Sequence, residues 1–140
     1  MASRREKYPE TKWFHFYNAN PRNRITGDCV FRAITTATGK PYNECVMEMA
    51  ELMCKTGYAL NDSKGEEAYL KQLGWVKHKQ PRKADNTKYT GKEFCKIFEG
   101  ICVAHIGGHH MVCIKDGKVW DIWDSTNGCI GNYWTLGEVE

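Results

Sequence analysis

The chain has 140 residues, of which 41% are hydrophobic and 26% are charged, and its formal net charge is +3. This composition is typical of a folded globular protein and excludes a chain that is disordered throughout. The longest apolar runs have four residues, which is too short for a membrane-spanning helix. We therefore expect a single domain over residues 1–140, with residues 1–22 as an N-terminal arm or strand.

The N-terminal part of the chain begins with an aromatic segment and continues into two helices. Residues 13–17 read Trp-Phe-His-Phe-Tyr, and we expect a strand or arm that packs on the body of the protein. A helix is predicted to begin at Gly27 or Asp28 and to end at Gly39, because apolar residues follow the helical period between them. A second helix is predicted with Pro41 in its first turn. Its inner face would carry Cys45, Val46, Met49, Leu52 and Met53.

Two more helices are expected before residue 100. The third would run from about Ser63 to Leu73 and end at Gly74. The fourth would begin at Thr90, where Thr90 and Glu93 have the spacing of a capping box. Both helices flank or enter a basic segment, residues 71–96, which holds eight Lys and Arg against two acidic residues. We interpret this segment as a solvated loop and helix face, with contact to nucleic acid or an acidic partner as the alternative.

After residue 100 the pattern changes to short β-branched and aromatic runs bounded by glycines. The predicted strands cover residues 101–106, 110–114, 118–123 and 130–134. Asp116-Gly117, between two of these runs, is the strongest hairpin signal in the chain. Helices followed by an antiparallel sheet predict an α+β fold.

Seven cysteines are too few for a disulfide scaffold, and no pair has the spacing Cys-x-x-Cys. The first residues also show no hydrophobic stretch of the kind found in secretory signals. We therefore expect reduced cysteines and a cytoplasmic protein. Core positions are predicted for Cys45, Cys54, Cys95 and Cys113, whereas Cys129, in a loop, is either buried or an exposed thiol.

Cys29 is the candidate nucleophile. It follows a glycine turn and stands at the start of a predicted helix, where the positive end of the helix dipole favours a thiolate. The alternative is a buried cysteine that acts as a small apolar residue.

The predicted hairpin supplies a candidate base and a group to orient it. Numbering across the Asp116-Gly117 turn places His109 opposite Asp124 and leaves Asp121 diagonal to His110. An imidazole and a carboxylate on adjacent strands can fix the tautomer of the histidine. A single β-bulge would exchange these partners, so both carboxylates stay open on the register alone.

The order helical Cys29, strand histidine and then aspartate resembles that of the papain-like cysteine peptidase superfamily. Those enzymes place an amide side chain six residues before the nucleophile, where it helps to bind the oxyanion, and Asn23 occupies that position here. The match covers motifs between residues 23 and 124. It implies a papain-like fold in which N-terminal helices, including the nucleophile helix, pack on a C-terminal antiparallel sheet.

Two narrower resemblances concern the segment Gly-Asp-Cys-Val-Phe-Arg-Ala at residues 27–33. It is similar to the nucleophile motif of ovarian-tumour-type deubiquitinases, although Thr26 stands where those enzymes carry an aspartate. The chain most resembles small phage- and prophage-encoded proteins that share this start and the Asp-x-Trp-Asp-Ser segment at 121–125. The single histidine of that pattern corresponds to His110. The resemblance therefore implies Cys29, His110 and Asp124 as the catalytic groups with Asn23, and Asp121 and His109 as alternatives.

These resemblances imply a cysteine peptidase or isopeptidase that forms a thioacyl intermediate on a protein or peptide substrate. An acyltransferase of the transglutaminase kind would use the same three groups. The runner-up is a catalytically silent scaffold that binds a host protein. No cofactor, metal, membrane or nucleic-acid partner is expected, and the sequence gives no indication of oligomeric state.

Two other patterns in the sequence allow a different interpretation. The spacing Cys-x6-Cys-x2-His-x3-His, from Cys95 to His109, could hold a metal, but zinc sites use tighter cysteine spacing. Three arginines, Arg22, Arg24 and Arg32, lie close to Cys29 in the sequence. They would either favour acidic substrates or pair with Asp28 and nearby carboxylates, and the sequence does not choose between these roles.

Overall fold

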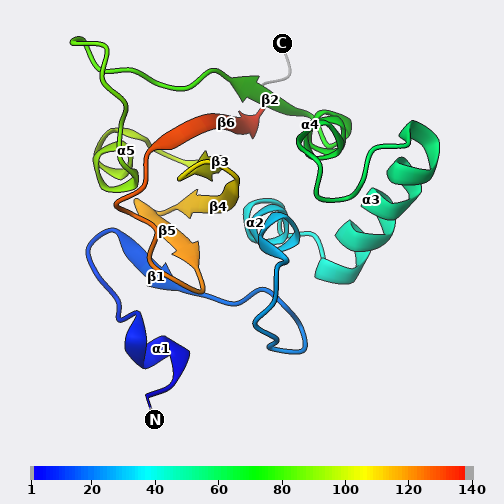
Figure 1. The fold of residues 1–140 in the computed structure, drawn as a ribbon, viewed down its shortest axis with the longest axis horizontal. Helices are drawn as coiled ribbons and strands as arrows, with labels where there is room; N and C mark the ends of the chain where they lie inside the picture. Colours follow the sequence, from blue (N-terminus) through cyan, green and yellow to red (C-terminus); the bar gives the residue numbers. More distant parts are fainter. Residues whose placement is uncertain (1, 138–140) are drawn as a thin grey trace.

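The computed structural model describes residues 2–137 as an α+β fold built on one mixed sheet (Figure 1). Across the sheet the strands lie in the order β1-β5-β4-β3-β6-β2. All neighbours are antiparallel except β1, which is parallel to β5. The strands are β1 (Phe14–Phe16), β2 (Trp75–His78), β3 (Ile101–Ile106), β4 (His110–Lys115), β5 (Lys118–Asp121) and β6 (Ile130–Leu136).

Four helices lie close to the predicted positions, whereas the short helix at residues 4–7 was not predicted. The helices are α1 (Arg4–Lys7), α2 (Cys29–Thr38), α3 (Tyr42–Thr56), α4 (Ser63–Gln72) and α5 (Gly91–Ile97). The left-handed Gly39, with φ 74°, ends α2, and the predicted capping box of Thr90 and Glu93 begins α5. Within α3 the predicted inner face is too wide, because Met53 is 41% exposed while Cys45 and Met49 are buried.

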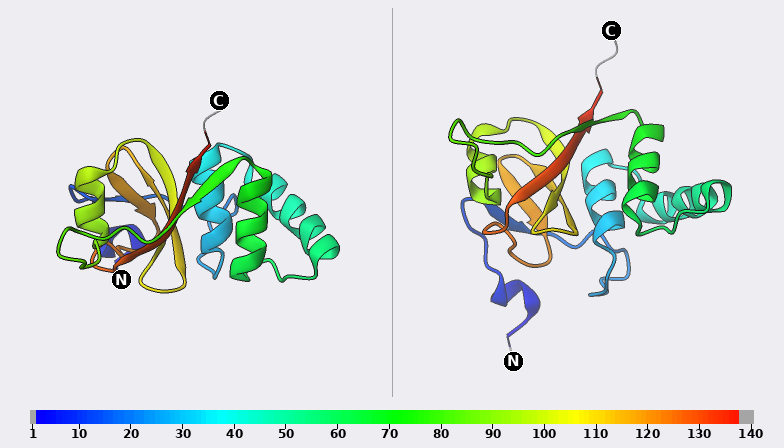
Figure 2. Two further views of the ribbon diagram at one scale, coloured as in Figure 1. Left: turned by 90° about the horizontal axis from the view of Figure 1, so that it is seen from above. Right: turned by 45° about the horizontal axis from the view of Figure 1, so that its top comes forward.

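Two hydrophobic cores lie on opposite faces of the sheet. Helices α2, α3 and α4 cover one face, and α5 covers the other (Figures 1 and 2). The alternation of β3 explains the division: Val103 faces the core of α2, whereas Cys102 and Ala104 face that of α5. The same alternation in β4 sends Met111 toward α2 and Val112 toward α5. Strand β4 is therefore buried on both faces.

The predicted hairpin between β4 and β5 forms with the expected register. Lys115 pairs with Lys118 and Cys113 pairs with Trp120, and both turn residues, Asp116 and Gly117, have the positive φ of a tight hairpin turn. The predicted length of the second strand is wrong, because β5 ends at Asp121 rather than at residue 123. Since β4 begins only at His110, the predicted pair of residues 109 and 124 does not form.

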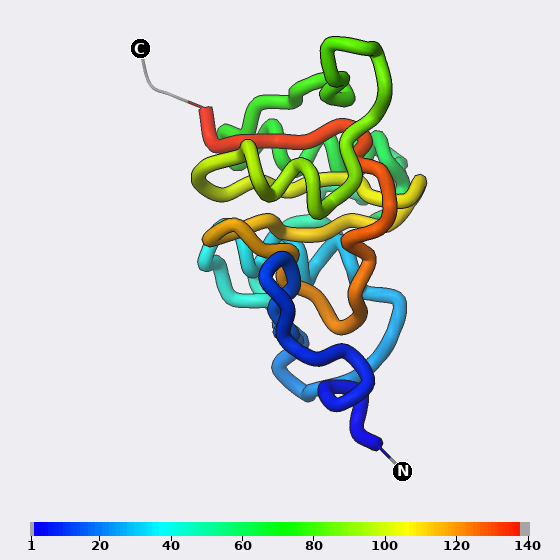
Figure 3. Tube along the Cα trace, turned by 90° about the vertical axis from the view of Figure 1, so that its left-hand side faces the viewer, coloured from blue at the N-terminus to red at the C-terminus, as the bar shows by residue number. Residues whose placement is uncertain are grey.

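One edge strand corrects the expectation of a purely antiparallel sheet, and the strand at the other edge was not predicted. The aromatic segment at 13–17 does pack on the body, with Phe14 fully buried, but its strand β1 adds parallel to β5 at one edge (Figure 3). At the other edge, β2 pairs with β6 and buries Trp75. Strand β2 lies inside the basic segment 71–96 that was expected to be only loop and helix. No helix in residues 2–137 combines the length and apolarity needed to cross a membrane.

Candidate active site

The ends of three elements meet at the candidate site. Cys29 is the first residue of α2, His110 is the first residue of β4, and Asp121 is the last residue of β5. Helix α2 packs on β4, and β4 is hydrogen-bonded to β5. The packing of α2 and the register of the hairpin therefore bring three chain segments together that span residues 29 to 121.

His110 and Asp121 are directly hydrogen-bonded. The distance between His110 Nε2 and Asp121 Oδ2 is 2.5 Å, and the aspartate side chain is 1% exposed. The other carboxylate oxygen, Oδ1, accepts from the backbone N–H of Ile122 at 2.7 Å. Because Nε2 is held by the carboxylate, Nδ1 is the ring nitrogen left to exchange a proton with a nucleophile.

The environment of Cys29 favours its thiolate. Burial raises the pKa of the Cys29 thiol, but hydrogen bonding to His110 and to the backbone N–H of Met111, together with the positive charges of His110 and Arg32, lowers it below its ordinary value. The other cysteines with displaced pKa values differ. Burial alone raises the pKa of Cys95 to about 11, and burial also raises the pKa of Cys113 to about 12.

The pKa of His110 moves in the opposite direction. Burial lowers it, but hydrogen bonds and charge interactions with Asp121 and Cys29 outweigh burial and raise the pKa to about 9 from an ordinary value of 6.5. A lowered thiol pKa beside a raised imidazole pKa is the signature of a thiolate–imidazolium pair. The ring of Trp123 packs beside that of His110, with 4.9 Å between the two centroids.

Arg32 connects α2 to Asp121, the hydrogen-bond partner of His110. Its Nη1 donates to Asp121 Oδ1 at 2.5 Å and its Nε donates to Asp28 Oδ1 at 2.7 Å. All three side chains are at least nine-tenths buried. The structure thereby settles one open alternative: Arg32 pairs with carboxylates and does not face solvent. Its guanidinium holds Asp121 from the side opposite His110.

Asp28 is the far end of this buried chain of charges. Its Oδ2 accepts hydrogen bonds from the Tyr42 hydroxyl at 2.7 Å and from Asn20 Nδ2 at 3.0 Å. Burial raises the pKa of Asp28, but the hydrogen bonds from Arg32, Tyr42 and Asn20 lower it overall. The sequence carried a signal for this arrangement, because Asp28 and Arg32 stand four residues apart on one helix face. No pattern in the sequence indicated that Tyr42 and Asn20 would hydrogen-bond to Asp28.

The structure does not bring Asp124 to the histidine. Asp124 Oδ1 accepts from the backbone N–H of Thr126 at 2.9 Å and from its hydroxyl at 2.6 Å. Asp124 thus closes a turn between β5 and β6, and Asp121, the alternative, stands next to His110. His109 is exposed in the turn between β3 and β4. It contributes no contact to this group of residues.

Asn23 lies in the loop that leads into α2 and has a positive φ of 54°. Its side-chain Oδ1 accepts from Asn18 Nδ2 at 3.4 Å, and it makes no hydrogen bond to Cys29 within the described part of the chain. A second possible donor to a substrate oxygen is the backbone N–H of Cys29. As the first residue of α2 it has no intrahelical partner, and Asp28 does not cap the helix with its side chain.

The remaining sequence candidates do not gather into a site. Within residues 2–137 no three His, Cys, Asp or Glu side chains come together as a metal site would require. Cys45, Cys95 and Cys113 are buried as predicted, but Cys54 is exposed, and so is Cys129. The chain was also compared with known proteins. No protein-family model, no curated protein and no solved structure matches it.

Proposed function

We propose that this protein is a papain-like cysteine peptidase or isopeptidase in which Cys29 is the nucleophile, His110 the general base and acid, and Asp121 the group that orients the histidine. The observation that carries the proposal is the arrangement of the group: His110 is hydrogen-bonded to Cys29 and, through Nε2 at 2.5 Å, to the buried carboxylate of Asp121. The lowered pKa of Cys29 and the raised pKa of His110 agree with this arrangement. A cysteine that served only to fill the core would have a raised pKa, as Cys95 does.

The proposed reaction begins with the thiolate. Cys29 Sγ attacks the carbonyl carbon of an amide and forms a carbon–sulfur bond, while the carbonyl π electrons move to the oxygen. The imidazolium of His110 then gives its proton to the leaving amine as the carbon–nitrogen bond breaks, which leaves a thioester. Water attacks the thioester, His110 accepts the water proton, and the carboxylic acid is released with restoration of the thiolate–imidazolium pair.

Negative charge on the substrate oxygen needs hydrogen-bond donors. The backbone N–H of Cys29, at the N-terminus of α2, is one candidate, and the helix dipole there favours an anion. The Asn23 amide, predicted from its spacing, is the other. Asn23 Oδ1 already accepts from Asn18, so its NH2 group is the end that would face a substrate.

Two other functions would use the same scaffold. An acyltransferase would pass the thioester to an amine instead of water, and the triad is the same in both cases. A silent scaffold that binds a host protein would have no need of a thiolate. The displaced pKa values favour an enzyme over the silent scaffold.

The test is the rate at which iodoacetamide alkylates Cys29 between pH 4 and pH 10, followed by peptide mass spectrometry. We expect Cys29 to react well below pH 7 and ahead of Cys54 and Cys129, which are exposed and serve as references within the same molecule. His110→Ala should move the Cys29 profile to higher pH. His109→Ala, at an exposed neighbouring histidine, is the matched control and should leave the profile in place.

If Cys29 reacts like Cys54 and Cys129 in the wild-type protein, the enzyme proposal is wrong. If it reacts as expected, a peptide library with and without methylamine separates the remaining functions. Products that carry an added water indicate a peptidase, and products that carry methylamine in preference to water indicate an acyltransferase. Cys29→Ala should form neither product.

A further inference from the structure

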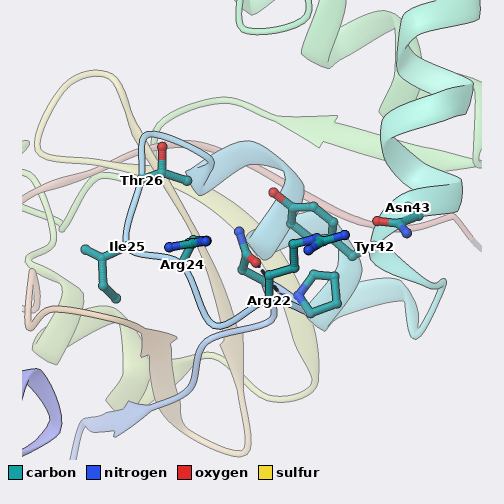
Figure 4. Close-up of a pocket in the computed structure, with 8 residues that line it drawn as sticks. Arg22, Arg24, Ile25, Thr26, Tyr42 and Asn43 are labelled. Atoms are coloured by element: carbon teal, nitrogen blue, oxygen red, sulfur yellow. Dashed lines mark hydrogen bonds between the residues drawn. The ribbon is translucent and has the colours of Figure 1, made fainter.

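A hollow beside the loop that leads into α2 carries two arginines with no use in the proposed mechanism. Its volume is about 650 Å³, and it lies between the loop that leads into α2 and the start of α3 (Figure 4). Arg22 and Arg24 come from the loop, and Tyr42 and Asn43 come from α3. Both arginines are exposed to solvent. The hollow is therefore open to a ligand.

The charge of this hollow is unbalanced. Within residues 2–137 neither Arg22 nor Arg24 forms an ion pair, and no Asp or Glu side chain lines the hollow. Arg32, the third arginine of this region, is fully used by its two buried aspartates. Two guanidinium groups without an ion-pair partner thus face solvent on the loop that leads to the candidate nucleophile.

The hollow is held in a fixed position relative to Cys29. Thr26, on its wall, stands three residues before Cys29, which limits the distance between the two Cα atoms to about 11 Å. Asn20 and Tyr42, also on its wall, are both hydrogen-bonded to the buried Asp28. An extended peptide advances about 3.3–3.6 Å per residue. A peptide held at Cys29 would therefore reach the hollow within two or three residues.

A second hollow carries acidic side chains instead of arginines. It has a volume of about 510 Å³ and lies between the start of α4 and the turn that precedes His110. Its lining includes Asp62, Glu66 and Glu67, together with His105. The two hollows lie along different segments of the chain: the first is lined by the loop before α2 and the start of α3, and the second by the start of α4 and the turn before His110. Acidic groups of a substrate are therefore attracted on the arginine side and repelled on the α4 side.

From these observations we infer that the arginine-lined hollow binds carboxylates of a peptide, two or three residues from the carbonyl that Cys29 attacks. The inference rests on the proposed function and names its substrate class as acidic peptides. Arginine suits this role because its planar guanidinium donates two parallel hydrogen bonds to a carboxylate. A nucleic acid fits less well. Proteins bind single-stranded nucleic acids in extended basic grooves that carry aromatic side chains on which the bases stack. This hollow has only two cationic side chains and one aromatic side chain, Tyr42, whose hydroxyl donates a hydrogen bond to Asp28.

The test uses chloroacetyl peptides that alkylate Cys29: its thiolate attacks the CH2 carbon, chloride leaves, and a thioether forms. The probes are chloroacetyl-Gly-Glu-Glu-amide, chloroacetyl-Gly-Gln-Gln-amide and the free-acid form of the second peptide. Each rate is divided by the iodoacetamide rate of the same variant, which removes general changes in thiol reactivity. We expect Cys29 to prefer Glu over Gln by about fivefold, as two exposed ion pairs would give. The preference should shrink at high salt.

The variant pair decides where this preference arises. In R22A/R24A the Glu-to-Gln ratio should fall to about one. K79A/K88A removes the same charge from two exposed lysines of the distant basic segment, and it should keep the ratio. An unchanged ratio in R22A/R24A would overturn the inference. A free acid that reacts faster than the Glu peptide in the wild type, and only with the arginines present, identifies a C-terminal carboxylate as the group bound.

A binding measurement separates failure of the hollow from failure of the enzyme. Fluorescein-labelled Gly-Glu-Glu-amide and Gly-Gln-Gln-amide are titrated with Cys29→Ala and followed by anisotropy, which requires no chemistry. Preference for Glu that disappears on adding R22A/R24A supports the hollow even if the alkylation profile of Cys29 is ordinary. Tighter, arginine-dependent binding of a labelled oligothymidylate would instead overturn the peptide assignment in favour of a nucleic acid.

Discussion

At the residue scale, the two oxygens of Asp121 have different partners. Oδ2 is hydrogen-bonded to His110, while Oδ1 accepts from Arg32 and from the backbone N–H of Ile122. With all of these partners the buried carboxylate can take only one orientation. The hydrogen bond between His110 Nε2 and this carboxylate in turn fixes the orientation of the imidazole ring. A general base that is held in this way loses little entropy when it acts on a substrate.

Asp121→Asn should therefore damage the site, and Asp124→Asn should not. The amide keeps the shape of Asp121 but removes the charge that raises the pKa of His110 above its ordinary value. We expect the His110 pKa to fall toward 6.5. At pH 7.5, one unit above that value, only about a tenth of the variant's histidine keeps the proton that supports the thiolate, so Cys29 alkylation at this pH should slow by about tenfold. The measurements are the titration of His110 by NMR and the alkylation rate. Equal effects of the two substitutions would contradict the assignment of Asp121.

At the element scale, Arg32 anchors α2 to the hairpin. The guanidinium lies between Asp28, at the N-terminus of the helix, and Asp121, at the end of β5. The position of the helix N-terminus decides where Cys29 lies relative to His110. A buried ion pair is not a strong source of net stability, because the loss of hydration offsets much of the attraction. Its value here lies in fixing the relative position of two elements.

Removing the cation should be costly, since it leaves two buried carboxylates facing each other. We expect Arg32→Met to lower the free energy of unfolding by about 3–5 kcal/mol at pH 7. The loss should shrink at acid pH. Arg32 lowers the pKa of Asp28, so this stabilisation is present above the ordinary pKa and is lost as the pH falls through the folded-state value. Urea unfolding at several pH values measures the effect.

Arg24→Met is the matched control for that experiment, because Arg24 is exposed and forms no ion pair within the described residues. It should change the free energy of unfolding by less than about 0.5 kcal/mol. If Arg32→Met were equally harmless, the buried bridge between α2 and β5 would have no structural role. Arg32→Lys keeps the charge but lacks the planar fork that contacts both aspartates, so we expect it to recover only part of the stability.

At the scale of the whole molecule, the charged groups of the candidate site also contribute to the stability of the fold. The sheet is covered on both faces, so the group formed by Cys29, His110 and Asp121 lies at the border of a core rather than on an open surface. Folding raises the pKa of His110 to about 9 from 6.5. The protonated histidine therefore stabilises the fold fully below pH 6.5, and this contribution is lost as the pH rises through about 9.

We expect this linkage to appear in the difference in unfolding free energy between the wild type and His110→Gln. The difference should be largest near pH 6 and should decline between pH 6.5 and about 9. Groups that titrate in the same way in both proteins do not contribute to this difference in unfolding free energy. In a Cys29→Ala background the decline should end at a lower pH, because the thiolate is one of the groups that raise the His110 pKa. A difference that rises with pH would contradict the protonated state of His110.

Much of the fold was determined locally and could be predicted. The glycine that ends α2, the capping box of α5 and the Asp116-Gly117 turn act over a few residues, so each is visible in the sequence. The turn also set the register of the hairpin. Cys29 could be nominated from its helix start, whereas the hairpin offered both His109 and His110, and the choice of His110 came from the family resemblance. Strand β2 was missed, since it exists only through its pairing with β6.

The identity of the carboxylate next to His110 was decided only by the tertiary structure. Register allowed either Asp121 or Asp124, and the outcome depends on where β5 stops and on what approaches it from α2. Arg32 reaches Asp121 across 89 residues of sequence, and Asp124 is engaged by Thr126 in its own turn. Contacts of this range depend on how elements pack, and no local pattern encodes them. The sequence by itself therefore determined the elements that depend on local signals and the chemistry they could carry. Tertiary packing decided the pairing of β2 and the partners of His110, because these contacts join segments far apart in the chain.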